Sequence, residues 1–174
     1  MNPKIIINII GFYLCWWITI YGAVIEYYFL GPLFLMMYMI IHFFYIAFHK
    51  MEYLYIIICF FLGLIIDTSI LKFDLISYKG YFPKYFGLAP LWSISLWICF
   101  GLSVFHSFKW LQKKYFFTMA LGIISGPAIY YSSYRAEIIN FNIPIYQILL
   151  VISFLWAFLL PLFIYIADYI LDEN

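Results

Sequence analysis

The sequence runs Ala89-Pro-Leu-Trp-Ser-Ile-Ser-Leu-Trp-Ile-Cys-Phe-Gly-Leu-Ser-Val-Phe-His-Ser-Phe-Lys-Trp110 through the stretch that is most informative about the fold. This run is long and apolar enough to cross a lipid bilayer as one helix. At about 100° of rotation per residue, its few polar side chains would occupy an arc of roughly 80° on one face. The members of this stripe are Trp92, Ser95, Cys99, Ser103, His106 and Trp110. Because ionisable groups inside a membrane are costly and rare, His106 is a candidate functional residue.

The composition of the whole chain also predicts a membrane protein. Of its 174 residues, 68% are hydrophobic, 25% are aromatic and only 10% are charged, whereas soluble domains carry about 25% charged residues. At about 20 residues per span, this length accommodates five or six transmembrane helices and no separate soluble domain. We therefore predict an all-α membrane protein in which residues 1–174 form a single integral membrane domain, a compact bundle of about six transmembrane helices. The six helices are expected at roughly 5–25, 31–48, 53–71, 89–110, 115–133 and 145–168.

Net charge and cysteine count argue against several classes of function. A formal net charge of +1 offers no basic surface for nucleic acid. The three cysteines are odd in number and lie in apolar stretches, so neither a disulfide framework nor a zinc knuckle is predicted. His42 and His49 lie two helical turns, or about 10 Å, apart, which is too far for them to share one metal ion. We therefore expect no metal, no cofactor and no nucleic-acid partner.

The lysine and arginine residues indicate how the helices are oriented. With six spans, one side of the membrane receives Lys4, Lys50, Lys109, Lys113 and Lys114. The other side receives Lys72, Lys79, Lys84 and Arg135. Positive charge near helix ends favours the cytoplasmic side, and the cluster at 109–114 lies beside two such ends. We therefore predict that both termini are cytoplasmic.

The predicted first helix repeats the stripe spacing of residues 89–110. Its small and polar residues follow steps of three and four: Asn8, Gly11, Cys15, Thr19, Gly22 and Glu26. Such spacing is typical of packed helix interfaces in membranes, where small residues let two backbones approach closely. An alternative is a chain built of two related three-helix halves, as in transporters, with Cys15 corresponding to Cys99.

Acidic residues in or beside apolar segments form a second group of candidates. Asp67 lies in Gly63-Leu-Ile-Ile-Asp67-Thr-Ser69, and a carboxylate at the centre of a membrane helix costs about 2.5 to 3.5 kcal/mol. One interpretation is that Asp67, which is nearer the end of its span, reaches the membrane interface. The other is that it pairs inside the bundle with His106, Arg135, Tyr130 or Lys72. Glu26 and Asp168 lie near helix ends, where we expect water to solvate them.

The predicted fifth helix contains the motif Gly122-Ile-Ile-Ser-Gly126-Pro127-Ala-Ile-Tyr130. Glycines four residues apart predict close contact with a neighbouring helix, and the proline predicts a kink. A functional alternative places a polar cavity beside that kink. Tyr130 and Arg135 would then direct a hydroxyl group and a fixed cation toward an anionic headgroup.

Several motifs together carry a resemblance to a known family: Gly63…Asp67, Ala89-Pro90-Leu-Trp92…Leu96-Trp97…Phe100, His106-Ser107…Trp110-Leu111, Gly122…Gly126-Pro127…Tyr130…Arg135 and Leu155-Trp156-Ala…Leu-Pro161. In this order the chain resembles domain-of-unknown-function family 2878 (DUF2878), whose members are small multi-pass proteins of the bacterial inner membrane. It departs from the family at residues 132–137, where the family is glycine-rich around its arginine and this chain reads Ser-Ser-Tyr-Arg-Ala-Glu. The resemblance implies an uncharacterised multi-pass inner-membrane protein. The family's association with genes for lipid modification implies a lipid-facing role.

Three functions fit these observations. The first, which we expect, is binding or moving a lipid or amphiphile through a polar intramembrane cavity. That cavity would be lined by Asp67, Ser103, His106, Tyr130 and Arg135, together with Trp92 and Trp110. The second is a structural or assembly subunit of a membrane complex, whose polar stripes are helix contacts. The third is a lipid-modifying enzyme with His106 and Asp67 as acid and base, which requires them within about 3 Å or one water molecule of each other.

Overall fold

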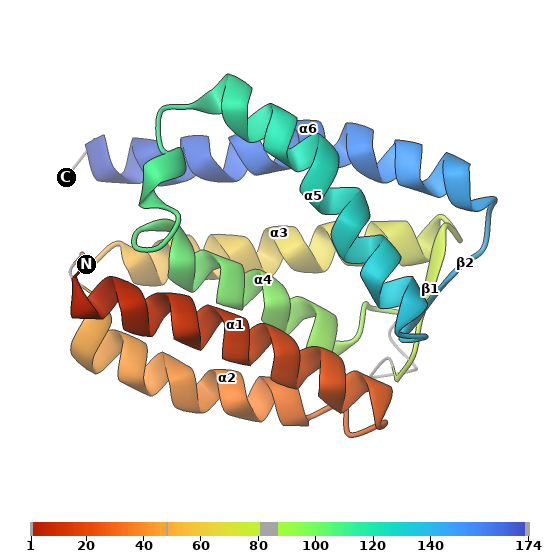
Figure 1. Ribbon diagram of the computed structural model, residues 1–174, viewed down its shortest axis with the longest axis horizontal. Helices are drawn as coiled ribbons and strands as arrows, with labels where there is room; N and C mark the ends of the chain where they lie inside the picture. Colours follow the sequence, from red (N-terminus) through yellow and green to blue (C-terminus); the bar gives the residue numbers. More distant parts are fainter. Residues whose placement is uncertain (1, 48, 81–86, 173–174) are drawn as a thin grey trace.

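The computed structural model describes residues 2–47, 49–80 and 87–172, so that Lys84 lies outside the described residues. These residues form six α-helices (Figure 1): α1 (Pro3–Val24), α2 (Leu30–Ile41), α3 (Glu52–Lys72), α4 (Leu91–Val104), α5 (Tyr115–Arg135) and α6 (Ile145–Asp172). A π-helical turn, η1 (His42–Ile46), continues α2, and a 3₁₀ turn, η2 (Lys109–Leu111), follows α4. Two short strands, β1 (Ile76–Tyr78) and β2 (Ile139–Phe141), lie in the connections. The helical fold class predicted from the sequence is confirmed.

Three of the described helices are long and apolar enough to cross a membrane: α1, α3 and α6. The longest is α6, whose 28 residues span about 42 Å at 1.5 Å per residue, the thickness of a bilayer with its headgroups. Large apolar side chains such as Trp17, Phe61 and Phe154 are exposed on these helices. An apolar outer face of this kind is consistent with a protein that sits in a membrane.

Helix α4 lies at the centre of the bundle. It packs against α1 and α2 on one side and against α3 on the other, while α5 packs along α6 (Figure 1). The start of α1 and the end of α6 lie at the same end of the bundle (Figure 1). Ten of the fourteen residues of α4 are buried, as expected for a helix that is hydrophobic on nearly every side. The face of α4 that carries the polar stripe is therefore buried, but so are most of its other faces.

The predicted fourth helix is wrong at its C-terminal end. Helix α4 stops at Val104, because the Ser103 carbonyl accepts backbone N–H groups from both His106 (3.1 Å) and Phe108 (3.0 Å) as the chain turns. His106 and Trp110 consequently lie beyond the helix, and Trp110 is 53% exposed. The stripe from Trp92 to Trp110 thus holds as one helical face only as far as Ser103.

The stripe of the first helix is used for contacts between helices, as the spacing predicts. Asn8, Gly11, Cys15, Thr19 and Gly22 are all buried, whereas Glu26 is exposed. Gly11 lies under the ring of Tyr38 in α2, and Asn8 Nδ2 donates to the Leu102 carbonyl of α4 at 2.9 Å. The three cysteines are buried and free, as expected for small core residues.

A two-stranded antiparallel pairing, which the sequence did not reveal, joins two distant connections. Strand β1 follows α3 and strand β2 precedes α6, with Ile76 opposite Phe141 and Tyr78 opposite Ile139. Three-residue strands leave too short an alternating pattern to be recognised in a chain this apolar. The pairing holds Tyr78 at one end of the bundle, against α3 and α5.

Asp168 is not solvated, contrary to the expectation from its place near a helix end. Its side chain is buried, and Oδ2 accepts hydrogen bonds from the Lys113 backbone N–H (2.8 Å) and from Tyr115 Oη (2.9 Å). The carboxylate thereby connects α6 to the start of α5. Helix α6 continues to Asp172, beyond the predicted end at 168, so that Asp168 lies within the helix and not at its end.

Candidate functional site

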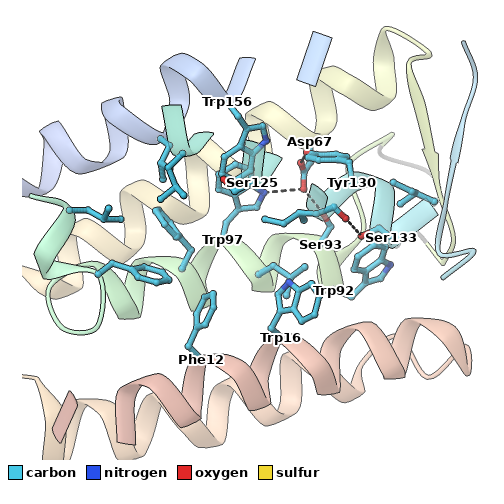
Figure 2. Close-up of a pocket in the computed structure, with 18 of the residues that line it drawn as sticks. Phe12, Trp16, Asp67, Trp92, Ser93, Trp97, Ser125, Tyr130, Ser133 and Trp156 are labelled. Atoms are coloured by element: carbon cyan, nitrogen blue, oxygen red, sulfur yellow. Dashed lines mark hydrogen bonds between the residues drawn. The ribbon is translucent and has the colours of Figure 1, made fainter. Parts of the chain in front are cut away.

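A largely apolar cavity of about 240 Å³ lies over the central helix α4. Figure 2 shows Phe12 and Trp16 of α1 directed into it from one side, and Trp156 of α6 and Ser125 of α5 from the other. Besides these it is lined by Asp67, Tyr78, Trp92, Ser93, Leu96, Trp97, Phe100, Phe108, Trp110, Leu111, Leu121, Ile129, Tyr130, Ser133, Ile139 and Leu160. Aromatic and aliphatic groups therefore form most of the wall, with polar groups concentrated around Asp67.

The Asp67 carboxyl group is the centre of the polar part of this cavity. Its side chain belongs to α3 and is 2% exposed. Oδ2 accepts hydrogen bonds from Ser93 Oγ and from Trp97 Nε1 (3.0 Å), both in α4. Oδ1 accepts one from Tyr130 Oη of α5 (3.1 Å). Three donors from two neighbouring helices therefore offset the cost of burying this carboxyl group.

Two glycines make room for the tryptophans beside Asp67. A Cβ atom added at Gly63 would overlap the Trp97 ring, and one added at Gly126 would overlap the Trp156 ring. The two indole rings stack, with centroids 5.5 Å apart and an interplanar angle of 17°. Gly63 precedes Asp67 by four residues and Gly126 precedes Tyr130 by four, so each glycine shares a helical face with a polar group of the site. The pattern Gly-x-x-x-polar thus places the Trp97 ring next to Asp67 and the Trp156 ring next to Tyr130.

Two further donors at this end of the cavity lie near Asp67 and Tyr130 without forming a hydrogen bond of normal geometry to any described residue. Tyr78 Oη and Trp156 Nε1 are buried and make no hydrogen bond within the described part of the chain, although both residues line the cavity. Burial, and secondly the nearby Asp67 carboxylate, raise the pKa of Tyr78 well above its usual value of about 10. The phenol is therefore protonated at neutral pH and able to donate. Buried donors without acceptors are uncommon and call for a physical explanation.

Four of the seven side chains predicted to line a binding cavity meet here: Asp67, Tyr130, Trp92 and Trp110. Tyr130 is a direct partner of Asp67, as one of the sequence-based alternatives has it. Trp92 lies in the wall, and its Nε1 donates to the Lys79 carbonyl at 3.0 Å.

The remaining three, Ser103, His106 and Arg135, lie elsewhere. Ser103 is buried and donates to the Cys99 carbonyl of its own helix at 3.2 Å. Arg135 is exposed, in a shallow recess with Lys79, Tyr134, Glu137 and Asn140. The predicted grouping of Arg135 with Tyr130 is wrong, because the two side chains leave the end of α5 on different faces.

His106 does not meet Asp67, so that the alternative in which these two residues pair is not realised. Its Nε2 lies 2.9 Å from Glu52 Oε2, at the first turn of α3. Asp67 lies fifteen residues further along the same helix, which is about 22 Å at 1.5 Å per residue. An acid–base pair formed by His106 and Asp67 is therefore not available in this fold.

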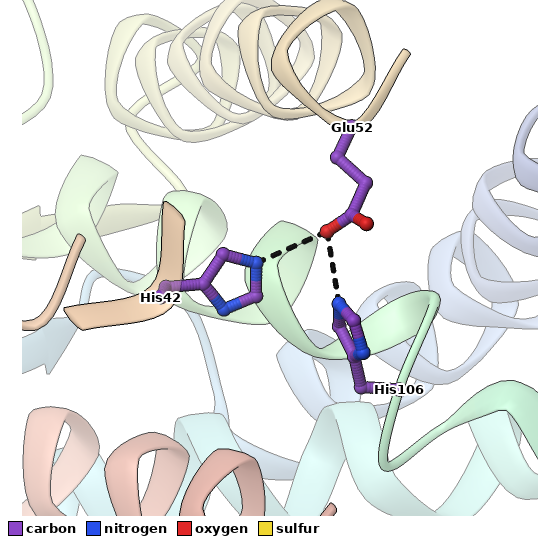
Figure 3. Close-up of side chains that lie close together, drawn as sticks. All are labelled: His42, Glu52 and His106. Atoms are coloured by element: carbon purple, nitrogen blue, oxygen red, sulfur yellow. Dashed lines mark hydrogen bonds and ion pairs between the residues drawn. The ribbon is translucent and has the colours of Figure 1, made fainter. Parts of the chain in front are cut away.

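A second buried polar cluster instead gathers His42, Glu52 and His106 (Figure 3). His42 Nε2 of η1 lies 3.1 Å from the same Glu52 Oε2 atom that His106 approaches. The three residues are respectively 0%, 1% and 8% exposed, and the imidazole rings lie nearly perpendicular with centroids 5.0 Å apart. Glu52 Oε1 accepts the backbone N–H of His49 at 3.1 Å, which fixes the carboxylate.

Reasoning from the sequence missed several residues that the structure brings together. Ser93 and Trp97 lie four residues apart on one face of α4, a spacing that could have indicated paired donors. Trp97 and Trp156 belong to the quoted family motifs, but the motifs alone do not indicate what these two side chains contact. Glu52 lies between the predicted spans 31–48 and 53–71, and nothing local indicates that His42 and His106 approach it.

The chain was compared with protein families, curated proteins and solved structures. A family model described as "Protein of unknown function (DUF2878)" matches residues 5–162 of the chain. No curated protein and no solved structure matches it.

Proposed function

The chain belongs to the DUF2878 family, and we propose that it is a membrane protein that binds a neutral amphiphile in the cavity over α4. The apolar chain of the ligand would lie between the aromatic walls, and its polar group would lie beside Asp67. The observation that carries this proposal is the pair of buried donors, Tyr78 Oη and Trp156 Nε1, which form no hydrogen bond of normal geometry to a described residue at the polar end of an otherwise apolar cavity.

The apolar walls decide which kind of molecule fits but supply little affinity. Phe12 and Trp16 of α1 face Leu121 and Ile129 of α5 across the cavity. In a bilayer, lipid tails are as apolar as these side chains, so moving an acyl chain from the membrane into the cavity brings little hydrophobic gain. Selectivity must therefore come from the polar end.

The polar end favours a hydrogen-bond acceptor that carries no negative charge. Asp67 already accepts three hydrogen bonds, and its carboxylate would repel an anionic group. Tyr78 and Trp156 each offer an unused donor. A hydroxyl, ester, ketone or aldehyde oxygen matches this arrangement, whereas a fatty acid or phosphate does not. Because Arg135 lies in a separate recess, no lysine or arginine among the described residues lines the cavity to compensate an anion.

The size of the cavity limits how much of the ligand it holds. Small-molecule sites usually enclose roughly 300 to 1,000 Å³, and this cavity encloses about 240 Å³. A compact amphiphile, or the polar end and first methylenes of a longer one, would fill it. The rest of a long chain would remain in the bilayer.

This function is expected in a multi-pass protein of the bacterial inner membrane. Besides α1, α3 and α6, we propose that the shorter apolar helices α2 with η1 and α4, and the 21-residue α5, also lie at membrane depth. The even number of helices agrees with the termini lying at one end of the bundle (Figure 1). We propose that this end is cytoplasmic, because Lys109, Lys113 and Lys114 lie between α4 and α5.

A photoreactive ligand tests the proposal. Protein in lipid nanodiscs is exposed to a fatty alcohol that carries a diazirine in its chain, and crosslinked peptides are identified by mass spectrometry. We expect crosslinks in the segments that contain Leu96, Phe100 and Leu121. Unlabelled fatty alcohol should compete better than the fatty acid of equal length, because only the acid carries a negative charge beside Asp67.

Two variants of α5 provide a matched comparison. Ser125→Trp would fill the cavity, whereas Ile124→Trp places the same side chain on a face that is 70% exposed. Crosslinking of the cavity peptides should fall several-fold in Ser125→Trp and stay unchanged in Ile124→Trp. Equal crosslinking in the two variants would contradict a ligand in this cavity, and equal competition by acid and alcohol would contradict selection for a neutral group.

A further inference from the structure

The cluster of His42, Glu52 and His106 has no part in the proposed amphiphile site, from which it is separated along α3. We propose that these three residues bind a divalent first-row transition-metal ion of the Zn²⁺ type. Two imidazoles and one carboxylate are a common ligand set for such ions, and three protein ligands leave one coordination position for water.

The distances suit metal coordination. Ligand atoms about 2.1 Å from one ion, at angles of 90° to 110°, lie about 3.0 to 3.4 Å from one another. The His106 Nε2 to Glu52 Oε2 distance is 2.9 Å and the His42 Nε2 to Glu52 Oε2 distance is 3.1 Å. The three ligand atoms all lie within 4.8 Å of one another. The two imidazole nitrogens thus lie on one carboxylate oxygen at the spacing of ligands that share an ion.

The three ligands come from three separate elements that the fold brings together. Figure 3 shows both imidazoles directed at the same carboxylate, His42 from the turn that follows α2 and His106 from the turn that follows α4. His42 is the first residue of η1, in which the Ala47 N–H donates to the His42 carbonyl in a π-type hydrogen bond of 2.8 Å. Single π-helical turns occur frequently at functional sites. An ion would join α2, α3 and α4 at the end of the bundle.

Hydrogen bonding alone offers a competing explanation, in which both imidazoles donate to Glu52. In both explanations His42 acts through Nε2, and His42 Nδ1 is buried with no hydrogen bond within the described residues. The substitution Glu52→Gln separates the two explanations. A glutamine amide oxygen still accepts hydrogen bonds from imidazoles but is a poor ligand for a transition metal, since it carries no charge.

Metal content of the purified protein is the first measurement. The protein is prepared in detergent with an affinity tag that contains no histidine, and its metals are quantified by inductively coupled plasma mass spectrometry. We expect about one ion per chain in the wild type and in His49→Ala, and less than about a tenth of an ion in His42→Ala, His106→Ala and Glu52→Gln. His49 is the control because it contacts Glu52 through its backbone N–H, which alanine retains, while its Nδ1 atom accepts the Met51 backbone N–H.

Cobalt binding to the wild-type protein tests the metal site even where a variant fails to fold. Metal-free wild-type protein is titrated with Co²⁺, and we expect visible d–d absorption bands that saturate at one equivalent and disappear on addition of excess Zn²⁺. A wild-type protein without bound metal and without these bands would overturn the proposal. Loss of metal from His49→Ala to the same extent as from His106→Ala would also overturn the three-residue assignment.

Discussion

The hydrogen bond from Trp97 to Asp67 can be isolated by comparing two tryptophan substitutions. Trp97 and Trp156 stack on each other, and each lies over a glycine in a buried position. Of these two tryptophans, only Trp97 forms a hydrogen bond of normal geometry through its indole N–H to a described residue, Asp67. Trp97→Phe and Trp156→Phe therefore remove a similar amount of ring and an identical polar group, but only the first breaks a hydrogen bond.

The expected magnitude follows from that difference. A hydrogen bond to a charged group contributes about 1.5 to 3 kcal/mol in water-soluble proteins, and interhelical hydrogen bonds in membranes contribute roughly 0.6 to 2 kcal/mol. We therefore expect Trp97→Phe to lower the free energy of unfolding by about 1 to 2 kcal/mol more than Trp156→Phe, a factor of about 5 to 30 in the unfolding equilibrium. The loss of packing is common to both variants and cancels in the comparison.

Equilibrium unfolding in mixed micelles, followed by far-ultraviolet circular dichroism, measures this difference without relying on tryptophan fluorescence. Adding Asp67→Asn to each variant completes a double-mutant cycle, in which coupling is expected with Trp97 and not with Trp156. Equal destabilisation by the two phenylalanine substitutions, within about 0.5 kcal/mol, would refute the role assigned to the Trp97 N–H.

Two further predictions concern packing and a buried carboxylate. Gly63→Ala should lower the free energy of unfolding by about 1 to 3 kcal/mol, because its Cβ would overlap the Trp97 ring. Gly101→Ala should lower it less, because the nearest contact of its Cβ would be Cys59 Sγ at 3.1 Å. Thermal unfolding of the two variants tests which one is less stable. Asp168→Asn should lower the free energy of unfolding by about 1 to 3 kcal/mol, because Asp168 is buried and accepts two hydrogen bonds. Asp172→Asn should have little effect on it, because Asp172 forms an exposed ion pair with Lys113. Similar losses of stability in both variants would contradict this prediction.

Local sequence patterns were sufficient for the helices and for one helix interface. The apolar runs predict six helices near the observed positions because hydrophobicity and turn residues act over neighbouring residues. The small residues of α1, such as Gly11 and Cys15, are buried against neighbouring helices as their spacing indicates. The fourth helix was predicted too long because the turn after Ser103 depends on contacts with other helices: the Ser107 N–H is bonded to Asn8 Oδ1 of α1.

The partners of the buried polar groups could not be predicted in this way. Asp67 was correctly singled out as a costly residue, yet its donors Ser93, Trp97 and Tyr130 lie 26, 30 and 63 residues away along the chain. His106 was singled out for the same reason, but its partner Glu52 is 54 residues distant and is itself inconspicuous at the start of an apolar helix.

By itself, the sequence determined that this chain is helical, that it is apolar enough for a membrane, and which residues are too polar to be buried without a partner. Only the tertiary structure decided that Asp67 and His106 belong to two separate sites, one in the cavity over α4 and one with His42 and Glu52. The physical reason is that the cost of burying a polar group is a property of that residue, whereas its compensation depends on which helices pack against it. Helix packing is set by the whole bundle, and a stripe on one helix does not specify the side chain that will face it.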